Sequence, residues 1–104
     1  NVAIGPNEET EVKVVMTEGK MILFEWQVDR GDIYSDYHGH DPELGSEFWV
    51  RYREQMEGSN GEGSLVAPFG GDHGWYWVNY NEHPVVVTLT VTGYFDGLVD
   101  YGIF

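Results

Sequence analysis

The sequence contains no cysteine and few basic residues. Without a thiol, disulfide bonds, thiolate zinc sites and cysteine nucleophiles are excluded. Lysine and arginine together number 5 against 18 aspartate and glutamate residues, which gives a formal net charge of −13. Nucleic acid is not expected as a partner, because neutralising its phosphates requires the basic side chains that this chain lacks. A cation or a protein with a basic surface would be attracted instead.

Long apolar runs are also missing. No segment approaches the roughly 20 consecutive apolar residues that span a bilayer, and the opening NVAIGPNEET does not resemble a signal segment. The length of 104 residues fits one domain. We expect residues 1–104 to form a single domain, the soluble part of a longer chain that meets a membrane only through an anchor outside this sequence.

The chain is instead rich in aromatic residues that alternate with polar ones. It has 4 tryptophans, 7 tyrosines and 5 phenylalanines. In ILFEWQV, Phe24, Trp26 and Val28 alternate with Glu25 and Gln27, the pattern of a strand with one buried face. Seven or eight such short segments with turn residues between them predict an all-β fold, an antiparallel β-sandwich.

Several local predictions accompany this fold. Residues 11–16 and 22–28 are expected to form a hairpin through the turn at 17–20, and residues 48–53 a strand, with a short helix as the alternative. Residues 98–104 could be a strand or a tail. The segment MEGSNGEGS at 56–64 has the composition of an exposed, mobile loop.

The stretch HGWYW at 73–77 allows two interpretations. In a strand, Trp75, Trp77 and Asn79 share one face, while Tyr76 and Tyr80 share the other. Either the tryptophans fill the core and the tyrosines face solvent, or the tryptophans form an exposed platform of the kind that holds sugar rings. We expect HGWYW to be mostly framework, with its histidine at the functional edge.

A histidine-rich segment, YHGHDPE at 37–43, is the first candidate for a binding site. His38 and His40 are two residues apart, so an extended backbone places both imidazoles on one side. Asp36 and Asp41 could add oxygen ligands, and His73 could join from the start of its strand. This ligand set would suit Zn²⁺, Cu²⁺ or Ni²⁺, and calcium less, because no carboxylates have EF-hand spacing. The alternative is a set of solvated loop residues.

Catalytic motifs are not recognisable. The serines lie in no nucleophile motif, and no glycine-rich phosphate loop opens a helix. We therefore expect the chain not to be an enzyme.

Part of the sequence resembles a known family of sandwiches. The segment from 62 to 95 resembles the last strands of GOLD-type β-sandwiches, the lumenal domain of early-secretory cargo adaptors, although it lacks their cysteine pair. The matching positions are Leu65, Ala67, Pro68, Gly70 or Gly71, Trp75, Trp77, Asn79 and 85–91. Most of the chain is similar to bacterial membrane-anchored, periplasm-facing proteins that share its HGW-aromatic-W strand and an aromatic-His-Gly turn, here Tyr37, His38 and Gly39.

The resemblance implies a GOLD-like or jelly-roll-like sandwich that acts as a non-catalytic binding module, periplasmic or extracellular and membrane-anchored. Its expected ligand is a divalent transition metal or a protein partner, with carbohydrate as the alternative. The residues expected to contact a partner or ligand are Tyr37, Glu43, Trp75, Trp77 and Asn79.

Overall fold

The computed structural model describes residues 1–45 and 48–103. A 3₁₀ turn at Pro42–Leu44 is the one helical segment in these residues. The nine strands that they form are β1 (Val2–Ile4), β2 (Glu9–Met16), β3 (Met21–Val28), β4 (Ile33–His40), β5 (Trp49–Gly58), β6 (Asn60–Val66), β7 (Gly71–Val78), β8 (Val85–Gly93) and β9 (Gly97–Ile103).

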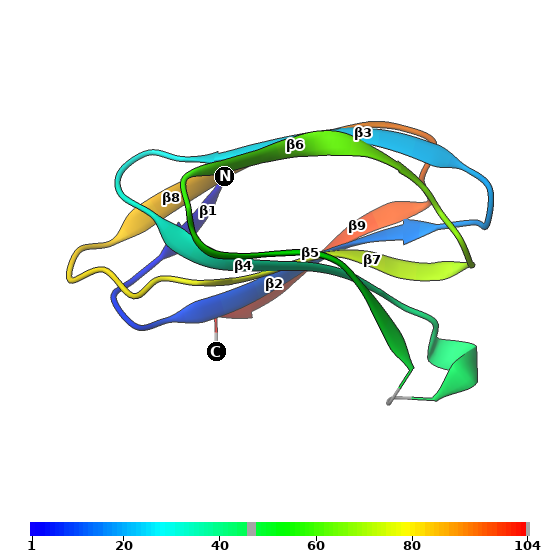
Figure 1. The fold of residues 1–104 in the computed structure, drawn as a ribbon, viewed down its shortest axis with the longest axis horizontal. Coiled ribbons are helices and arrows are strands. Elements are labelled where there is room, and N and C mark those ends of the chain that lie inside the picture. Colours follow the sequence, from blue (N-terminus) through cyan, green and yellow to red (C-terminus); the bar gives the residue numbers. More distant parts are fainter. Residues whose placement is uncertain (46–47, 104) are drawn as a thin grey trace.

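The strands form two antiparallel sheets that lie face to face (Figure 1). One sheet has the order β1-β8-β3-β6, and the other has the order β5-β4-β7-β2-β9. The predicted all-β antiparallel sandwich is confirmed, and the nine strands of the described residues slightly exceed the seven or eight expected. Residues 98–103 of the segment left open as strand or tail belong to β9, and residue 104 lies outside the described residues.

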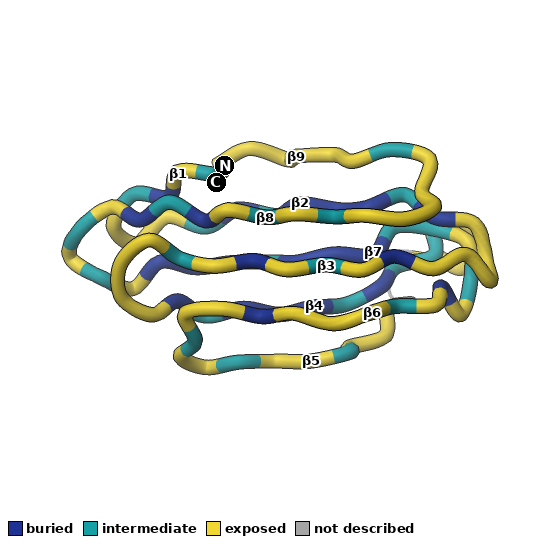
Figure 2. Tube along the Cα trace, turned by 90° about the horizontal axis from the view of Figure 1, so that it is seen from above, coloured by how far each residue is buried: buried dark blue, intermediate teal, exposed yellow. Residues whose placement is uncertain are grey.

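The core lies between the sheets and is mainly aromatic. Trp75 and Trp77 are 1% and 0% exposed, so the framework interpretation of HGWYW is confirmed. The ring of Tyr37 stacks on Trp75 at 5.0 Å and 10°, and Trp26 contacts Trp77 edge-on at 5.8 Å. Figure 2 shows burial concentrated on the central strands β2, β4 and β7 and exposure along the edge strands β5 and β9.

The predicted hairpin between residues 11–16 and 22–28 is wrong. Both segments are strands, but β2 pairs with β7 and β9, whereas β3 pairs with β6 and β8 in the other sheet. The connecting residues bond to a third segment, since Gly19 donates to Ala67 O and Ala67 donates to Lys20 O, each at 2.9 Å. The turn therefore crosses between sheets, which lets both strands direct their apolar faces into one core.

The prediction of a mobile loop at 56–64 is also wrong. These residues form the end of β5 and most of β6. Gly61 and Gly63 pair with Trp26 and Phe24 of β3. A Cβ at Gly61 would collide with the Trp26 indole, and one at Gly63 would lie 3.2 Å from the Phe24 ring. The glycines make room for aromatic rings and do not mark a loop. The strand predicted at 48–53 is confirmed, and the helix alternative is wrong.

The histidine-rich segment is largely strand. β4 includes Tyr37, His38 and Gly39 and ends at His40, so these residues do not lie in a loop. Asp41, Pro42 and Glu43 lie beyond β4, where the Asp41 side chain caps the 3₁₀ turn by accepting from Glu43 N at 2.9 Å. Because His38 and His40 lie within β4, the alternation of side chains along the strand determines which face of the sheet each histidine occupies.

Candidate functional site

The outer face of the five-stranded sheet carries a polar row centred on Gly74. Gly74 pairs with Lys13 of β2 on one side and with His38 of β4 on the other. Because Gly74 has no side chain, Lys13 can extend across it, and its Nζ lies 2.6 Å from Nε2 of His38. The next row along the strands places Asp72 opposite His40.

Lys13 is an almost buried cation, with 4% of its surface exposed. Burial lowers the pKa of Lys13, and the nearby carboxylate of Glu11, 3.6 Å away, opposes that shift. Contact with the imidazole of His38, whose Nε2 lies 3.4 Å from Oε2 of Glu11, lowers the pKa of Glu11 against the effect of burial. When the ammonium group donates to Nε2 of His38, the ring proton sits on Nδ1, 3.2 Å from the carbonyl oxygen of Asp36.

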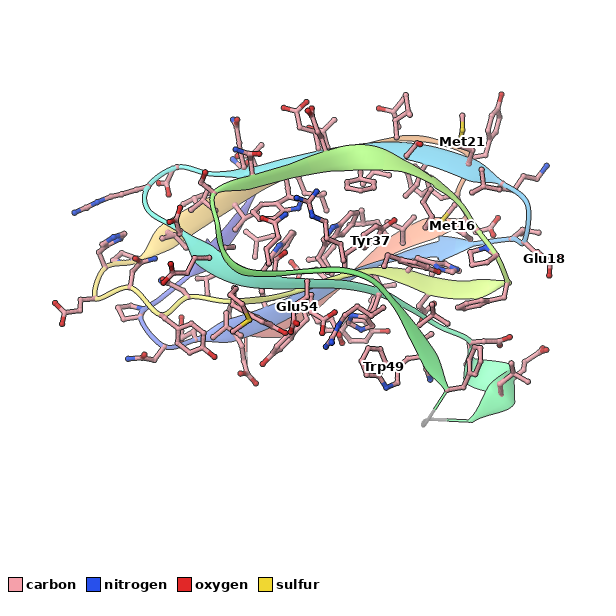
Figure 3. All side chains as sticks on the ribbon, viewed as in Figure 1. Met16, Glu18, Met21, Tyr37, Trp49 and Glu54 are labelled. Carbon is pink, nitrogen blue, oxygen red and sulfur yellow. The ribbon has the colours of Figure 1, made fainter. Side chains whose placement is uncertain are left out.

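A second ion pair joins Arg51 to Asp36, and its guanidinium group contacts the aromatic ring of Trp49. Arg51 donates to both carboxylate oxygens of Asp36, from Nε at 3.2 Å and from Nη2 at 2.8 Å. The same guanidinium lies over the ring of Trp49, with Cζ 5.2 Å from the ring centroid. Trp49 also meets His38 edge-on at 5.7 Å. Figure 3 shows Trp49 on the outer side of this sheet, away from the core.

A hollow of about 310 Å³ lies on this outer face, lined by Lys13, His38 and their neighbours. Its polar floor comes from the three central strands, β2, β7 and β4, and each edge strand contributes an aromatic residue. Trp49 of β5 is 47% exposed and Tyr101 of β9 is 51% exposed. The residues that line the hollow are Glu11, Lys13, Asp36, His38, His40, Trp49, Asp72 and Tyr101.

The structure separates His73 from the other two histidines of the expected site. Gly39 pairs directly with His73, so the two segments are neighbours as expected. The alternation of side chains nevertheless places His38 and His40 on the outer face and His73 on the inner face. His73 is 0% exposed; its Nε2 lies 3.0 Å from Phe69 O, and its Nδ1 lies 2.8 Å from a tyrosine hydroxyl. It belongs to the core and not to the hollow.

Other residues expected to contact a ligand are also inside the sandwich. Trp75, Trp77 and Tyr37 form the aromatic core. Asn79 is 0% exposed, and its amide nitrogen donates to three carbonyl oxygens, those of Ile4, Gly5 and His83. Asn79 therefore ties the end of β7 to two neighbouring loops.

The remaining predicted residues divide between the hollow and its surroundings. Asp36, His38 and His40 line it, whereas Asp41 and Glu43 do not. Within residues 1–45 and 48–103, no group of three or more histidine, aspartate or glutamate side chains is arranged to hold a metal ion. Nε2 of His38 also lies 2.6 Å from Nζ of Lys13, so this ring nitrogen already has a hydrogen-bond partner.

Sequence reasoning missed Lys13, Glu11, Asp72, Trp49 and Tyr101. The alternation of β2 contained a usable signal, because Glu11 and Lys13 alternate with the buried Val12 and Val14 and must therefore face outward. Tyr101 carried no such signal, since its strand was not established. The contribution of Trp49 depends on the pairing of β5 with β4, which alternation alone does not specify.

No family model matches the chain, and no curated protein matches it. In the part of the chain that the structure describes, no helix has the length and apolar character needed to cross a membrane.

Proposed function

We propose that this domain is a non-catalytic binding module whose outer-face hollow binds an uncharged, hydroxyl-rich ligand of the saccharide class. The observation that carries the proposal is the arrangement of the hollow, in which exposed aromatic rings from both edge strands flank a polar floor. Flat aromatic rings can stack on the apolar faces of sugar rings, and the floor can bond to hydroxyl groups.

The charges of the floor favour a neutral ligand. The carboxylate of Asp36 is paired with Arg51, and that of Glu11 lies beside Lys13. Each of these two pairs compensates its own charge, so among the described residues that line the hollow the carboxylate of Asp72 is the one without an ion-pair partner. Hydroxyl groups both donate and accept hydrogen bonds, and the floor offers both kinds of partner, including the ammonium group of Lys13 and the carboxylate of Asp72.

The floor is also rigid. Its side chains come from the three central strands of a sheet and are held by one another, as in the bond between Lys13 and His38. A preformed set of partners reduces the entropy lost on binding. The resemblance to membrane-anchored, periplasm-facing proteins supports placing this module outside the cytoplasm, held by an anchor beyond residues 1–104.

Trp49 supplies the test. It is 47% exposed, whereas the other three tryptophans are at most 2% exposed, so ligand-dependent fluorescence should report on Trp49. We expect a neutral oligosaccharide from a panel built of glucose, mannose, galactose or N-acetylglucosamine to change this emission. Calorimetry should show binding abolished in Trp49→Ala and partly retained in Trp49→Phe, whose ring can still stack.

Tyr94→Ala is the matched control, because Tyr94 is 72% exposed and lies outside the hollow. It should bind the same oligosaccharide as the native protein does. The proposal fails if no member of the panel binds, or if Trp49→Ala binds with native affinity.

A further inference from the structure

The two sheets differ in width, and the narrower sheet ends at β6. The sheet that contains β6 has four strands, and the facing sheet has five. Figure 2 shows β3 and β6 lying over β7 and β4, while β5 continues beyond β6 with no strand of the described residues over it. The space over β5 is therefore the position that a fifth strand of the narrower sheet would occupy.

The free edge of β6 has backbone groups that point away from its sheet. Residues 60–66 pair with β3 in one unbroken register. Just beyond β6, both N–H and C=O of Ala67 bond to the chain before β3, and at the other end Ser59 O accepts from Val28 N at 2.8 Å. Alternate residues of an antiparallel strand bond to opposite sides, so the odd-numbered residues bond to β3. The residues that direct N–H and C=O towards the free edge are Glu62, Ser64 and Val66.

β6 also lacks the features that protect the other edges from pairing. β1 is three residues long, and the pairings of β5 and β9 with their neighbours contain register shifts. The sequence of β6, NGEGSLV, contains no proline and no lysine, and its pairing with β3 is regular. Short length, irregular pairing, proline and lysine are the usual means by which edge strands avoid another strand. β6 is thus the edge most open to an added strand.

An inter-sheet groove of about 250 Å³ lies at this edge and is lined by both β6 and β5. Gly61 and Gly63, which pair with inward-facing residues of β3, line the groove without a side chain. Its apolar surface comes from the half-buried Phe24, Tyr52 and Leu65. Successive side chains of a strand point to opposite faces. A strand added to β6 would therefore direct every second side chain into the groove.

The outer face of this edge is acidic. Glu62 of β6 lies directly opposite Glu25 of β3, and neither carboxylate forms an ion pair with another residue in the described ranges. Like charges directly opposite each other in a sheet are unfavourable, and opposite charges are favourable. A lysine or arginine of an added strand beside Glu62 would compensate this charge. The net charge of −13 disfavours a second copy of the chain at the same edge.

We infer that β6 is a docking edge for an extended peptide segment of a partner protein, which adds a fifth strand to the four-stranded sheet. Apolar side chains of the segment enter the inter-sheet groove, and they alternate with polar side chains on the outer face, one of them basic and beside Glu62. Main-chain bonds to the free edge provide affinity, and the alternating side chains provide specificity. This edge is separate from the outer-face hollow, which lies on the five-stranded sheet.

A synthetic seven-residue peptide tests this inference. It has valine at the odd positions, threonine at the second and sixth positions and lysine at the centre, and a comparison peptide has glutamate at the centre. Amide hydrogen exchange in the ¹⁵N-labelled protein is the readout. We expect the lysine peptide to slow exchange at Glu62, Ser64 and Val66, whereas the residues between them, already bonded to β3, should change little. It should bind about tenfold more tightly than the glutamate peptide.

Variants of the edge separate strand addition from general attraction to an acidic protein. Ser64→Pro should abolish binding, because proline removes an N–H from the free edge, and it should fold, because edge strands tolerate proline where the N–H faces solvent. Glu62→Gln should lose most of the preference for lysine over glutamate. Glu43→Gln is the matched control, since it removes the same charge from an exposed position outside β6. It should keep the native preference, and Trp49→Ala should bind the lysine peptide as the native protein does.

Three results would overturn the inference. One is the absence of binding, or binding without slower exchange at Glu62, Ser64 and Val66. Another is native affinity in a folded Ser64→Pro variant. The third is exchange at these residues that slows with rising protein concentration in the absence of peptide, which would assign the edge to a second copy of the chain.

Discussion

Lys13 and His38 meet across a residue without a side chain, with Nζ of the lysine 2.6 Å from Nε2 of the histidine. Gly74 lies between them in the strand pairing. A Cβ at this position would collide with Val12 O and lie 2.8 Å from the Cα of Lys13. These are backbone atoms, so they cannot move aside without disturbing the pairing of β2 and β7.

The first prediction follows from the lack of space for a Cβ atom at Gly74. Gly74→Ala should lower the free energy of unfolding by about 2 kcal/mol, as other overpacked positions do, and Tm by about 10 °C for a domain of this size. Thermal unfolding followed by circular dichroism measures both. Gly97→Ala is the control, because a Cβ there has no atom within 4 Å. Equal stability of the two variants would contradict the steric account of Gly74.

The second prediction concerns His73 and pH. Burial lowers the pKa of His73 below its ordinary value of 6.5, although the bond to Phe69 O opposes this. Between the folded and unfolded pKa values the unfolded chain binds more protons, so stability rises with pH in that window. The stability associated with neutral His73 should be complete well above the ordinary pKa of 6.5 and should decrease as the pH falls through and below that value.

The measurement is Tm as a function of pH in native protein and two variants. His73→Gln should have a flatter profile over this window, whatever its absolute stability. His83→Gln should keep the native slope, since His83 lies in a turn with Nδ1 3.1 Å from Pro84 O. A native slope in His73→Gln would assign the pH dependence to other groups.

The alternation of side chains was enough to predict the sandwich, but not which strands pair. Phe24 and Trp26 are correctly predicted to face the core, because a period of two is a local property of the chain. The hairpin prediction failed because pairing depends on distant segments, here β7 for β2 and β6 for β3. Gly61 carried an ambiguous signal, since glycine occurs both in loops and where a ring packs against a strand.

The candidate site, too, could be predicted from the sequence only in part. Placing the histidine segment beside the start of β7 was correct, and Gly39 and His73 are direct partners. Whether two paired strands present given side chains on the same face depends on register to a single residue. His38 and His73 are out of step by one position, which puts them on opposite sides of the sheet.

The third prediction addresses the metal site expected from His38 and His40. Nε2 of His38 lies 2.6 Å from Nζ of Lys13, and His73 lies on the other face, so a metal ion bound at Nε2 would have to displace the lysine and would lack His73 as a ligand. We expect Zn²⁺, Cu²⁺ and Ni²⁺ to change the Tm of the native protein by less than about 1 °C, because a ligand stabilises only as far as it binds the folded state. A larger rise that disappears in the His38→Ala, His40→Ala double variant would restore the metal hypothesis.

The fourth prediction concerns Asn79, expected as a ligand contact but found inside the fold. Its amide nitrogen donates to Ile4 O at 3.0 Å and to His83 O at 2.9 Å, while its amide oxygen accepts from Asn81 N at 2.9 Å. Asn79→Ala leaves these buried groups without partners, which should lower the free energy of unfolding by about 3 kcal/mol. Chemical denaturation gives this value directly.

Asn60→Ala provides the comparison, because Asn60 is exposed and its amide nitrogen donates to the hydroxyl of a neighbouring serine at the long distance of 3.5 Å. It should change the free energy of unfolding by less than about 0.5 kcal/mol, as is usual for surface positions. If the two variants were equally stable, the bonds of Asn79 would not be anchoring the loops. If Asn79→Ala instead remained stable but lost oligosaccharide binding, the residue would have the ligand role that its burial argues against.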